Sequence, residues 1–114
     1  MSKAVTFAVD PAFSRAARRM LGEDGIAEFK SYLSRNPLVG DVIAGTGGIR
    51  KVRWAAGGKG KRGGARVIYF FISEDALIYL LDIYAKSVKS NLSKAEMNEF
   101  KKLTAVIKRS HRRK

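Results

Sequence analysis

Two apolar segments that are separated by a short polar turn constrain this chain more than any other feature of its sequence. Residues 65–72 are mostly β-branched or aromatic, and residues 77–84 form a second apolar segment that contains a single acid, Asp82. The first segment is typical of a central strand that is buried on both faces. Because the turn Ser73-Glu74-Asp75 lies between them, we expect two antiparallel neighbours in the middle of a sheet.

Start and stop signals divide the rest of the chain. Residues 4–9 are short and β-prone, and Asp10-Pro11 then supplies an N-cap and a proline at the first helical position. Gly22 ends this helix, and a second helix runs from about residue 24 to Arg35 before Asn36-Pro37. A turn-rich connector (38–48) leads to a strand (49–55), and the capping box Ser93-x-x-Glu96 begins a last helix after the two apolar strands.

The resulting order, β-α-α-β-β-β-α, predicts an α+β fold in which helices pack on an antiparallel sheet of about four strands. A chain of 114 residues fits a single domain over residues 1–114. We expect the basic tail, at about 108–114, to fray.

The charge of the chain indicates its class of partner. Lys and Arg number 23 against 10 Asp and Glu, giving a net charge of +13 and a pI near 10.4. Such a field attracts polyanions, above all nucleic acids. The absence of cysteine excludes disulfides and thiol chemistry. With no apolar signal sequence and no apolar run long enough to span a bilayer, we expect a cytoplasmic protein with no membrane partner.

The positive charge is concentrated in one stretch, because no acid occurs between Asp41 and Glu74. Its basic residues are Arg50, Lys51, Arg53, Lys59, Lys61, Arg62 and Arg66. Five glycines between residues 57 and 64 would let the backbone and the lysines approach phosphates closely. The stretch therefore predicts RNA contact, and a solvated loop with dispersed charge is the alternative. Arg62 follows Lys61 where a P-loop requires Ser or Thr, so we reject nucleotide hydrolysis.

Arg66 is the most informative single residue, because it lies within an otherwise apolar strand. An unpaired guanidinium there would be costly to bury. It either faces a phosphate at the open end of the strand or pairs with Asp82 on the neighbouring strand. Tyr84 and Lys86 end that neighbouring strand near Arg66, where the ring would stack on a base or pack in the core and the ammonium would neutralise a phosphate. Trp54 is better explained by packing than by base stacking.

The sequence also restricts any catalytic mechanism. His111, the only histidine, lies in the basic tail, so a ribonuclease based on a His–His or His–Glu pair cannot be assembled. No cluster of residues has metal-ligand spacing, and we expect neither a metal nor a cofactor. Any cleavage of RNA must then rely on Lys, Arg and Tyr.

Three sequence segments together resemble a known family. GDVIAGTGGIRKVRW at 40–54, GKGKRGGARVIYF at 58–70 and IYLLDIYAK at 78–86 are similar to the signature of RelE/HigB-like toxins of type II toxin–antitoxin systems, and the resemblance extends over residues 36 to 108. It implies a compact RelE-like domain that cleaves messenger RNA in the ribosomal A site without a metal. It also implies a HigA-like helix-turn-helix antitoxin, with operator DNA bound only through the toxin–antitoxin complex.

The resemblance assigns roles by position. The residues expected to act in catalysis are Lys59, Lys61, Arg66 and Lys86, and those expected to bind RNA are Arg50, Lys51, Arg53, Arg62 and Tyr84. The family commonly has a polar residue and then Glu after this last lysine, whereas here Ser87-Val88-Lys89 follows Lys86. A non-catalytic ribosome- or RNA-binding module, a DNA-binding module and a receptor for an acidic protein remain the alternative functions.

Overall fold

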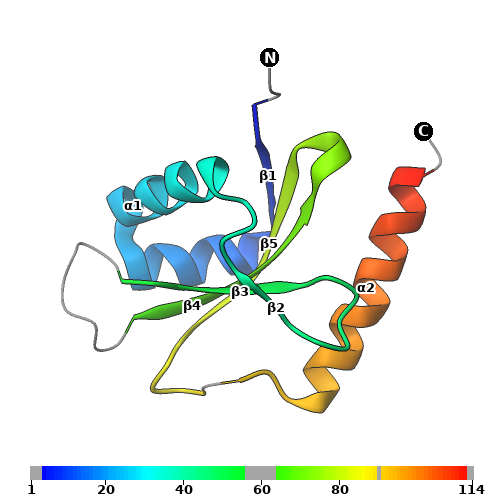
Figure 1. Cartoon of the computed structure of the whole chain (residues 1–114). Helices are drawn as coiled ribbons and strands as arrows, with labels where there is room; N and C mark the ends of the chain where they lie inside the picture. Colours follow the sequence, from blue (N-terminus) through cyan, green and yellow to red (C-terminus); the bar gives the residue numbers. More distant parts are fainter. Residues whose placement is uncertain (1–3, 56–63, 90, 113–114) are drawn as a thin grey trace.

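The computed structural model describes residues 4–55, 64–89 and 91–112, which fold into two helices and a five-stranded sheet (Figure 1). The elements in chain order are β1 (Thr6–Val9), α1 (Pro11–Arg35), β2 (Asp41–Val42), β3 (Arg50–Trp54), β4 (Ala65–Ile72), a 3-10 turn (Ser73–Asp75), β5 (Leu77–Ala85) and α2 (Lys94–Arg112). The sheet order is β1-β5-β4-β3-β2. The predicted α+β class is confirmed.

The centre of the sheet agrees with the prediction, and its edges differ from it. β4 pairs with β3 and with β5 in antiparallel fashion. β1, however, pairs parallel with β5, so the prediction of a wholly antiparallel sheet is wrong at this edge. Short turns reveal antiparallel neighbours in a sequence, whereas the neighbour of β1 lies about seventy residues further along the chain. The two-residue strand β2, inside the expected connector, adds a fifth strand.

The helix α1 combines the two helices that the sequence predicted. The Asp10 carboxylate accepts a hydrogen bond from the Phe13 amide at 2.7 Å, as an N-cap should. Helical geometry is interrupted at Gly22, which has a φ of 74° and a ψ of 169° and kinks the helix where we expected it to end. Both halves pack on the sheet through buried apolar side chains, with Phe13 from the first and Phe29 from the second.

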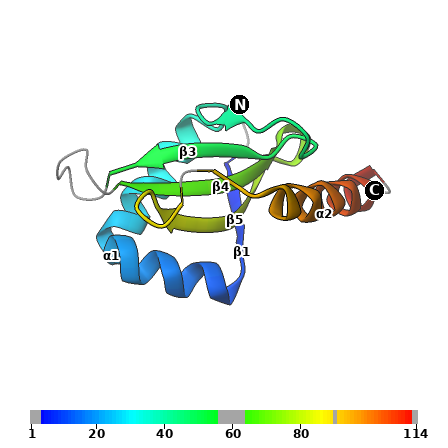
Figure 2. The same ribbon diagram turned by 90° about the horizontal axis from the view of Figure 1, so that it is seen from below.

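The two helices serve opposite faces of the sheet, because side chains alternate along a strand. On one face, Val67 and Tyr69 of β4 form a core with α1. On the other, Ile68, Phe70 and Ile72 pack with Ile107 of α2 and with Leu92, just before that helix. Figure 2 shows α1 beneath the sheet and α2 extending from its far end. α2 therefore leaves the end of its own face near Arg66 uncovered by the body of the helix.

The Gly-Thr-Gly-Gly segment of the connector is part of the scaffold, because it docks α2. Thr46 is fully buried, and its hydroxyl donates to the Ile43 carbonyl at 2.6 Å and accepts from the Ile49 amide at 3.1 Å. Its carbonyl accepts a hydrogen bond from the Thr104 hydroxyl of α2 at 2.9 Å. Gly47 has a φ of 82°, and a Cβ at this position would overlap the same hydroxyl.

The capping box of α2 is formed as expected. The Ser93 hydroxyl accepts from the Glu96 amide at 3.1 Å, and the Glu96 carboxylate accepts from the Ser93 amide at 2.8 Å. The helix continues to Arg112, so the prediction of a frayed tail is wrong for residues 108–112. His111 explains the difference, because its ring contacts the Asp75 carboxylate and lies 3.1 Å from the Tyr79 hydroxyl. Neither described helix is both long and apolar enough to cross a membrane.

Candidate functional site

A row of three side chains crosses the α2 face of the sheet, close to the end of β3 and the start of β4. Arg53 of β3 lies opposite Arg66 of β4, and Arg66 lies opposite Tyr84 of β5. Residues in direct register on adjacent strands share a face and are close neighbours. The row lies close to where β3 ends, at Trp54, and β4 begins, at Ala65.

Two polar atoms in this row are buried without a hydrogen-bond partner among the described residues: Nη1 of Arg66 and the hydroxyl of Tyr84. A buried donor that lacks a partner costs about 1–3 kcal/mol. Tyr84 is only 6% exposed, and Arg66 is partly buried. Nε1 of Trp54, on the α1 face, is likewise buried without a partner among the described residues. Each such group calls for an explanation, and a bound ligand is one.

The ionisation of Tyr84 follows from its surroundings. Burial raises the pKa of its hydroxyl above the usual value, while Lys89 and Arg66 act in the opposite direction. The phenol therefore stays protonated at neutral pH and offers a donor hydrogen to a ligand. Burial of the ring leaves little surface for base stacking, so a hydrogen bond from its hydroxyl is the better-supported role.

Asp82 does not neutralise Arg66. It lies opposite Ile68, two residues further along β4 than Arg66, and its carboxylate accepts from the Ile83 amide at 2.9 Å. None of the ion pairs within the described residues joins the two side chains. Burial raises the pKa of Asp82, and the nearby Lys89 opposes that rise. The Asp82 pairing that the sequence left open for Arg66 is therefore not formed among the described residues.

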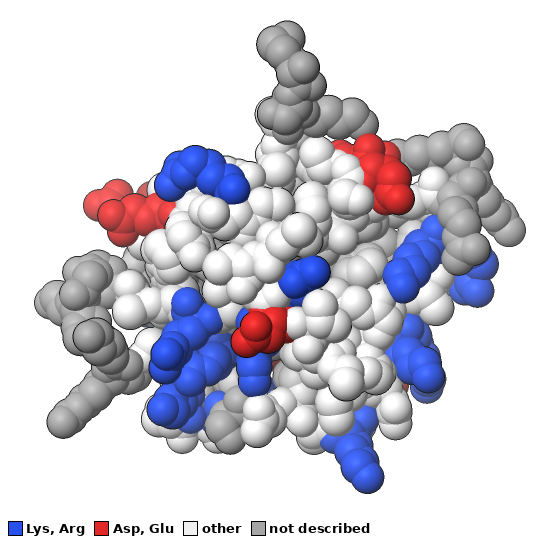
Figure 3. All heavy atoms as spheres, in the orientation of Figure 1, with Lys and Arg blue, Asp and Glu red and all other residues white. Residues whose placement is uncertain are grey.

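Other predicted residues lie around the row. Lys51, two residues from Arg53 on β3 and so on the same face, donates to Asn91 Oδ1 at 3.0 Å. Lys86 follows β5 and is exposed, and its amide lies 3.4 Å from the Gly64 carbonyl at the start of β4. Figure 3 shows lysine and arginine side chains gathered beside this end of β3 and β4. Lys59, Lys61 and Arg62 lie outside the described residues.

The structure places Arg50 apart from this group. Successive side chains of β3 point to opposite faces of the sheet, so Arg50 lies on the opposite face from Lys51. Its guanidinium donates to the carbonyls of Gly40 at 2.6 Å and Leu38 at 3.2 Å. Trp54 packs on Phe29 and Tyr32 of α1, with ring centroids 5.3 Å apart in each case, as the packing interpretation expected.

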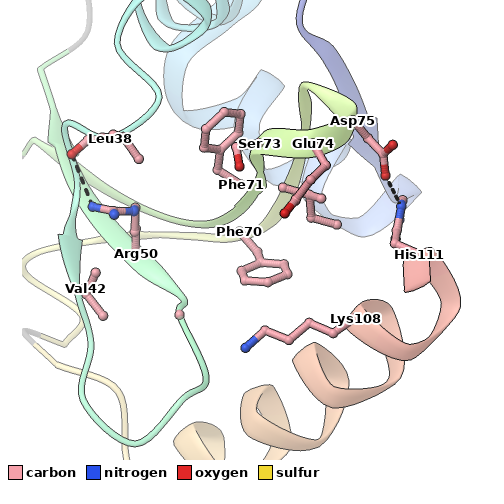
Figure 4. Close-up of a pocket in the computed structure, with 12 residues that line it drawn as sticks. Leu38, Val42, Arg50, Phe70, Phe71, Ser73, Glu74, Asp75, Lys108 and His111 are labelled. Carbon is pink, nitrogen blue, oxygen red and sulfur yellow. Dashed lines mark hydrogen bonds and ion pairs between the residues drawn. The ribbon is translucent and has the colours of Figure 1, made fainter.

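A concavity of about 750 Å³ lies at the other end of β4. Figure 4 shows Phe70 and Phe71 between Leu38 and Val42 on one side and Lys108 and His111 on the other. Its polar groups are largely engaged within the protein: the Arg50 guanidinium binds carbonyls, and His111 contacts Asp75. This cavity is thus a poorer candidate for a polyanion than the Arg53–Arg66–Tyr84 row.

Two residues near the row were missed by the sequence analysis. The ammonium of Lys89 lies over the Tyr84 ring, 4.7 Å from its centroid, and forms an ion pair with Glu96. The sequence identified Glu96 as a cap only. A local motif reveals the cap, but nothing in the sequence fixes the path that returns Lys89 over β5.

Comparison with known proteins identifies the family. The sequence matches, over residues 12–114, the family model described as the RelE toxin of the RelE / RelB toxin–antitoxin system. The chain belongs to the RelE toxin family. A solved structure of a mutant of the E. coli toxin RelE in the free state shares the RelE fold, with a TM-score of 0.55 and 15% sequence identity, over 76% of this chain and 88% of that chain. The RelE resemblance noted in the sequence is thus confirmed, and the chain is a toxin of the RelE type.

Proposed function

We propose that this RelE-family toxin is a ribosome-dependent endoribonuclease that cleaves messenger RNA in the A site and thereby inhibits translation. One observation carries the proposal: the Arg66 and Tyr84 donors, at the cationic end of the sheet, are buried without a hydrogen-bond partner among the described residues. A phosphodiester offers the oxygen acceptors that these donors need. RNA also matches the net charge of +13.

The proposed chemistry uses the RNA's own nucleophile. The 2′-hydroxyl attacks the adjacent phosphorus, the bond to the 5′-oxygen of the next nucleotide breaks, and a 2′,3′-cyclic phosphate and a 5′-hydroxyl result. Arg66 holds non-bridging oxygens through its planar fork, and the neutral Tyr84 hydroxyl donates to the same group. We assign the proton transfers to Lys59, Lys61 and Lys86, so that no metal is required.

The ribosome has a defined part in this proposal. With basic groups and no His–Glu pair in the row, the toxin would stabilise charge well but align the reacting atoms weakly. The ribosome supplies alignment by holding the message in the A site, and alignment lowers a barrier strongly. Arg53, Lys51 and Arg62 bind the transcript on either side of the scissile bond.

We also propose the partners that a RelE-type system implies. A HigA-like antitoxin with a helix-turn-helix neutralises the toxin in the bacterial cytoplasm, and operator DNA is bound only through their complex. Growth arrest on expression that is relieved by co-expression of the neighbouring gene supports this part. Growth arrest that the neighbouring gene does not relieve contradicts it.

The test maps new RNA ends in cells by primer extension after brief induction. Wild type is expected to produce ends within translated codons, and Arg66→Ala is expected to reduce their yield at least tenfold. Arg19→Ala, an equal loss of charge on an exposed position of α1, is the matched control and should cleave like wild type. Equal cleavage by Arg66→Ala and wild type would remove Arg66 from the site. Ribosome binding without new ends would favour the non-catalytic alternative.

A further inference from the structure

Lys89 and Glu96 form a polar pair beside the Arg66–Tyr84 site that the proposed mechanism does not use. The chain turns after β5, where the amides of Val88 and Lys89 return to the Ala85 carbonyl at 2.9 and 3.4 Å. This turn brings the ammonium of Lys89 to 4.7 Å from the centroid of the Tyr84 ring. Lys89 thus extends the cationic row by one further residue, on the Tyr84 side.

The Glu96 carboxylate is held at both oxygens. Oε1 accepts from the Ser93 amide at 2.8 Å as part of the capping box, and Oε2 binds the ammonium of Lys89. Because the capping box fixes Glu96, the ion pair fixes where the end of Lys89 lies. An ammonium carries three donors, so Glu96 leaves two of them for other acceptors. The Lys89 side chain is 29% exposed and remains accessible to a ligand.

We propose that Lys89 contacts a phosphate of the bound RNA next to the one held by Arg66, and that Glu96 is a positioning residue that holds Lys89 there. The inference rests on the proposed RNA site, and it assigns Lys89 a role that no sequence motif assigned. The pair also supplies a carboxylate near the site in a chain where Val88 stands in place of the family's common Glu.

The charges around Lys89 are consistent with a fixed cation. Glu96 on α2, and Asp82 and Tyr84 on β5, all raise the pKa of Lys89, while partial burial opposes them. The ammonium is therefore protonated at neutral pH and serves as a charged donor. It is not the base of the reaction.

The test measures binding of a short 2′-O-methyl RNA, which cannot be cleaved, by fluorescence anisotropy at several salt concentrations. Lys89→Met is expected to weaken binding about tenfold and to lower the slope of log K against log salt by about 0.7, the value for one contact to a single strand. Lys89→Arg keeps the charge and is expected to retain the wild-type slope. An unchanged slope in Lys89→Met would overturn the phosphate contact.

Glu96→Gln separates positioning from simple electrostatics. Glutamine can still accept from the Ser93 amide, so the cap is kept while the charge is lost. Removal of a negative charge beside a polyanion should by itself strengthen binding. If Glu96 positions Lys89, Glu96→Gln instead weakens RNA binding about threefold in the wild-type background. In the Lys89→Met background there is no ammonium to position, so the same substitution strengthens binding. Stronger binding in both backgrounds would overturn the positioning role.

A control pair lies on the same helix. Lys102 and Glu99 are 3.7 Å apart and highly exposed, and Lys102→Met and Glu99→Gln make the same charge changes away from the row. Neither should change the salt slope. Failure of this inference is distinguishable from failure of the proposed nuclease, because binding does not require cleavage. If Lys89→Met binds like wild type while Arg66→Ala abolishes cleavage, only the present inference fails.

Discussion

At the residue scale, Tyr84 and Asp82 carry two of the polar groups whose burial is costly in this structure. Both lie on β5, one with a buried hydroxyl that lacks a partner among the described residues and one with a half-buried carboxyl. A group retained at a cost to stability is a candidate for function. Substitution of Tyr84 is therefore expected to reduce activity without reducing stability, and substitution of Asp82 is expected to increase stability.

Tyr84→Phe removes the hydroxyl and keeps the ring. Because the hydroxyl has no hydrogen-bond partner among the described residues, we expect the free energy of unfolding to stay the same or to rise by about 1 kcal/mol. Cleavage on ribosomes should fall about tenfold, since one donor to the phosphate is lost. Thermal unfolding and single-turnover cleavage measure the two effects. A marked loss of stability would mean that the hydroxyl has a structural partner.

Asp82→Asn tests the cost of the buried carboxylate. Burial raises the pKa of Asp82 in the folded state, so ionisation opposes folding, and this penalty grows as pH rises above the unfolded value of 3.8. We expect the variant to have a higher Tm than wild type at pH 7, with the difference disappearing toward pH 4. The amide can still accept from Ile83. An equal Tm difference at both pH values would contradict this explanation.

At the element scale, the connector between β2 and β3 illustrates what sequence can and cannot reveal. The glycines of Gly45-Thr46-Gly47-Gly48 are recognisable as turn formers, and the family signature includes them. Their contact with α2 depends on Thr104, fifty-eight residues away from Thr46. Local signals predicted β1, β3, β4 and β5, a helix boundary at Gly22, where the helix kinks, and the cap at Ser93. They did not predict the parallel partner of β1 or the contact that holds the end of α2.

Gly47→Ala tests the docking of α2. Gly45 and Gly47 both have positive φ, at 81° and 82°, but only at Gly47 would a Cβ overlap Thr104. Gly45→Ala should cost about 1 kcal/mol for the left-handed backbone alone. Gly47→Ala should cost about 1–3 kcal/mol more, because the added methyl group overpacks the interface. Denaturant unfolding of both variants provides the comparison, and equal losses would show that the overlap is relieved without cost.

At the scale of the whole molecule, the site combines residues of β3, β4, β5 and α2, which lie in the C-terminal part of the sequence. Arg66 and Tyr84 could be placed together from sequence, because a short turn makes their strands antiparallel neighbours, whereas the register of Arg53 opposite Arg66 comes from the structure. Lys89 and Glu96 could not, because the path from β5 to α2 has no periodic pattern. The net charge of +13 indicated a polyanionic partner, but a total charge does not say which face receives it.

A comparison of Arg53→Ala with Arg19→Ala separates the overall field from the local site. Both variants lose one exposed positive charge, the first in the row on β3 and the second on α1, which packs on the opposite face. If the overall field alone recruited RNA, both would weaken binding equally. A local phosphate contact at Arg53 predicts instead that only Arg53→Ala lowers the slope of log K against log salt, by about 0.7 for a single strand. Anisotropy titrations with the 2′-O-methyl RNA, from about 50 to 200 mM salt, measure both slopes. Equal slopes would show that the molecule attracts RNA as a uniformly charged body, and would remove Arg53 from the site.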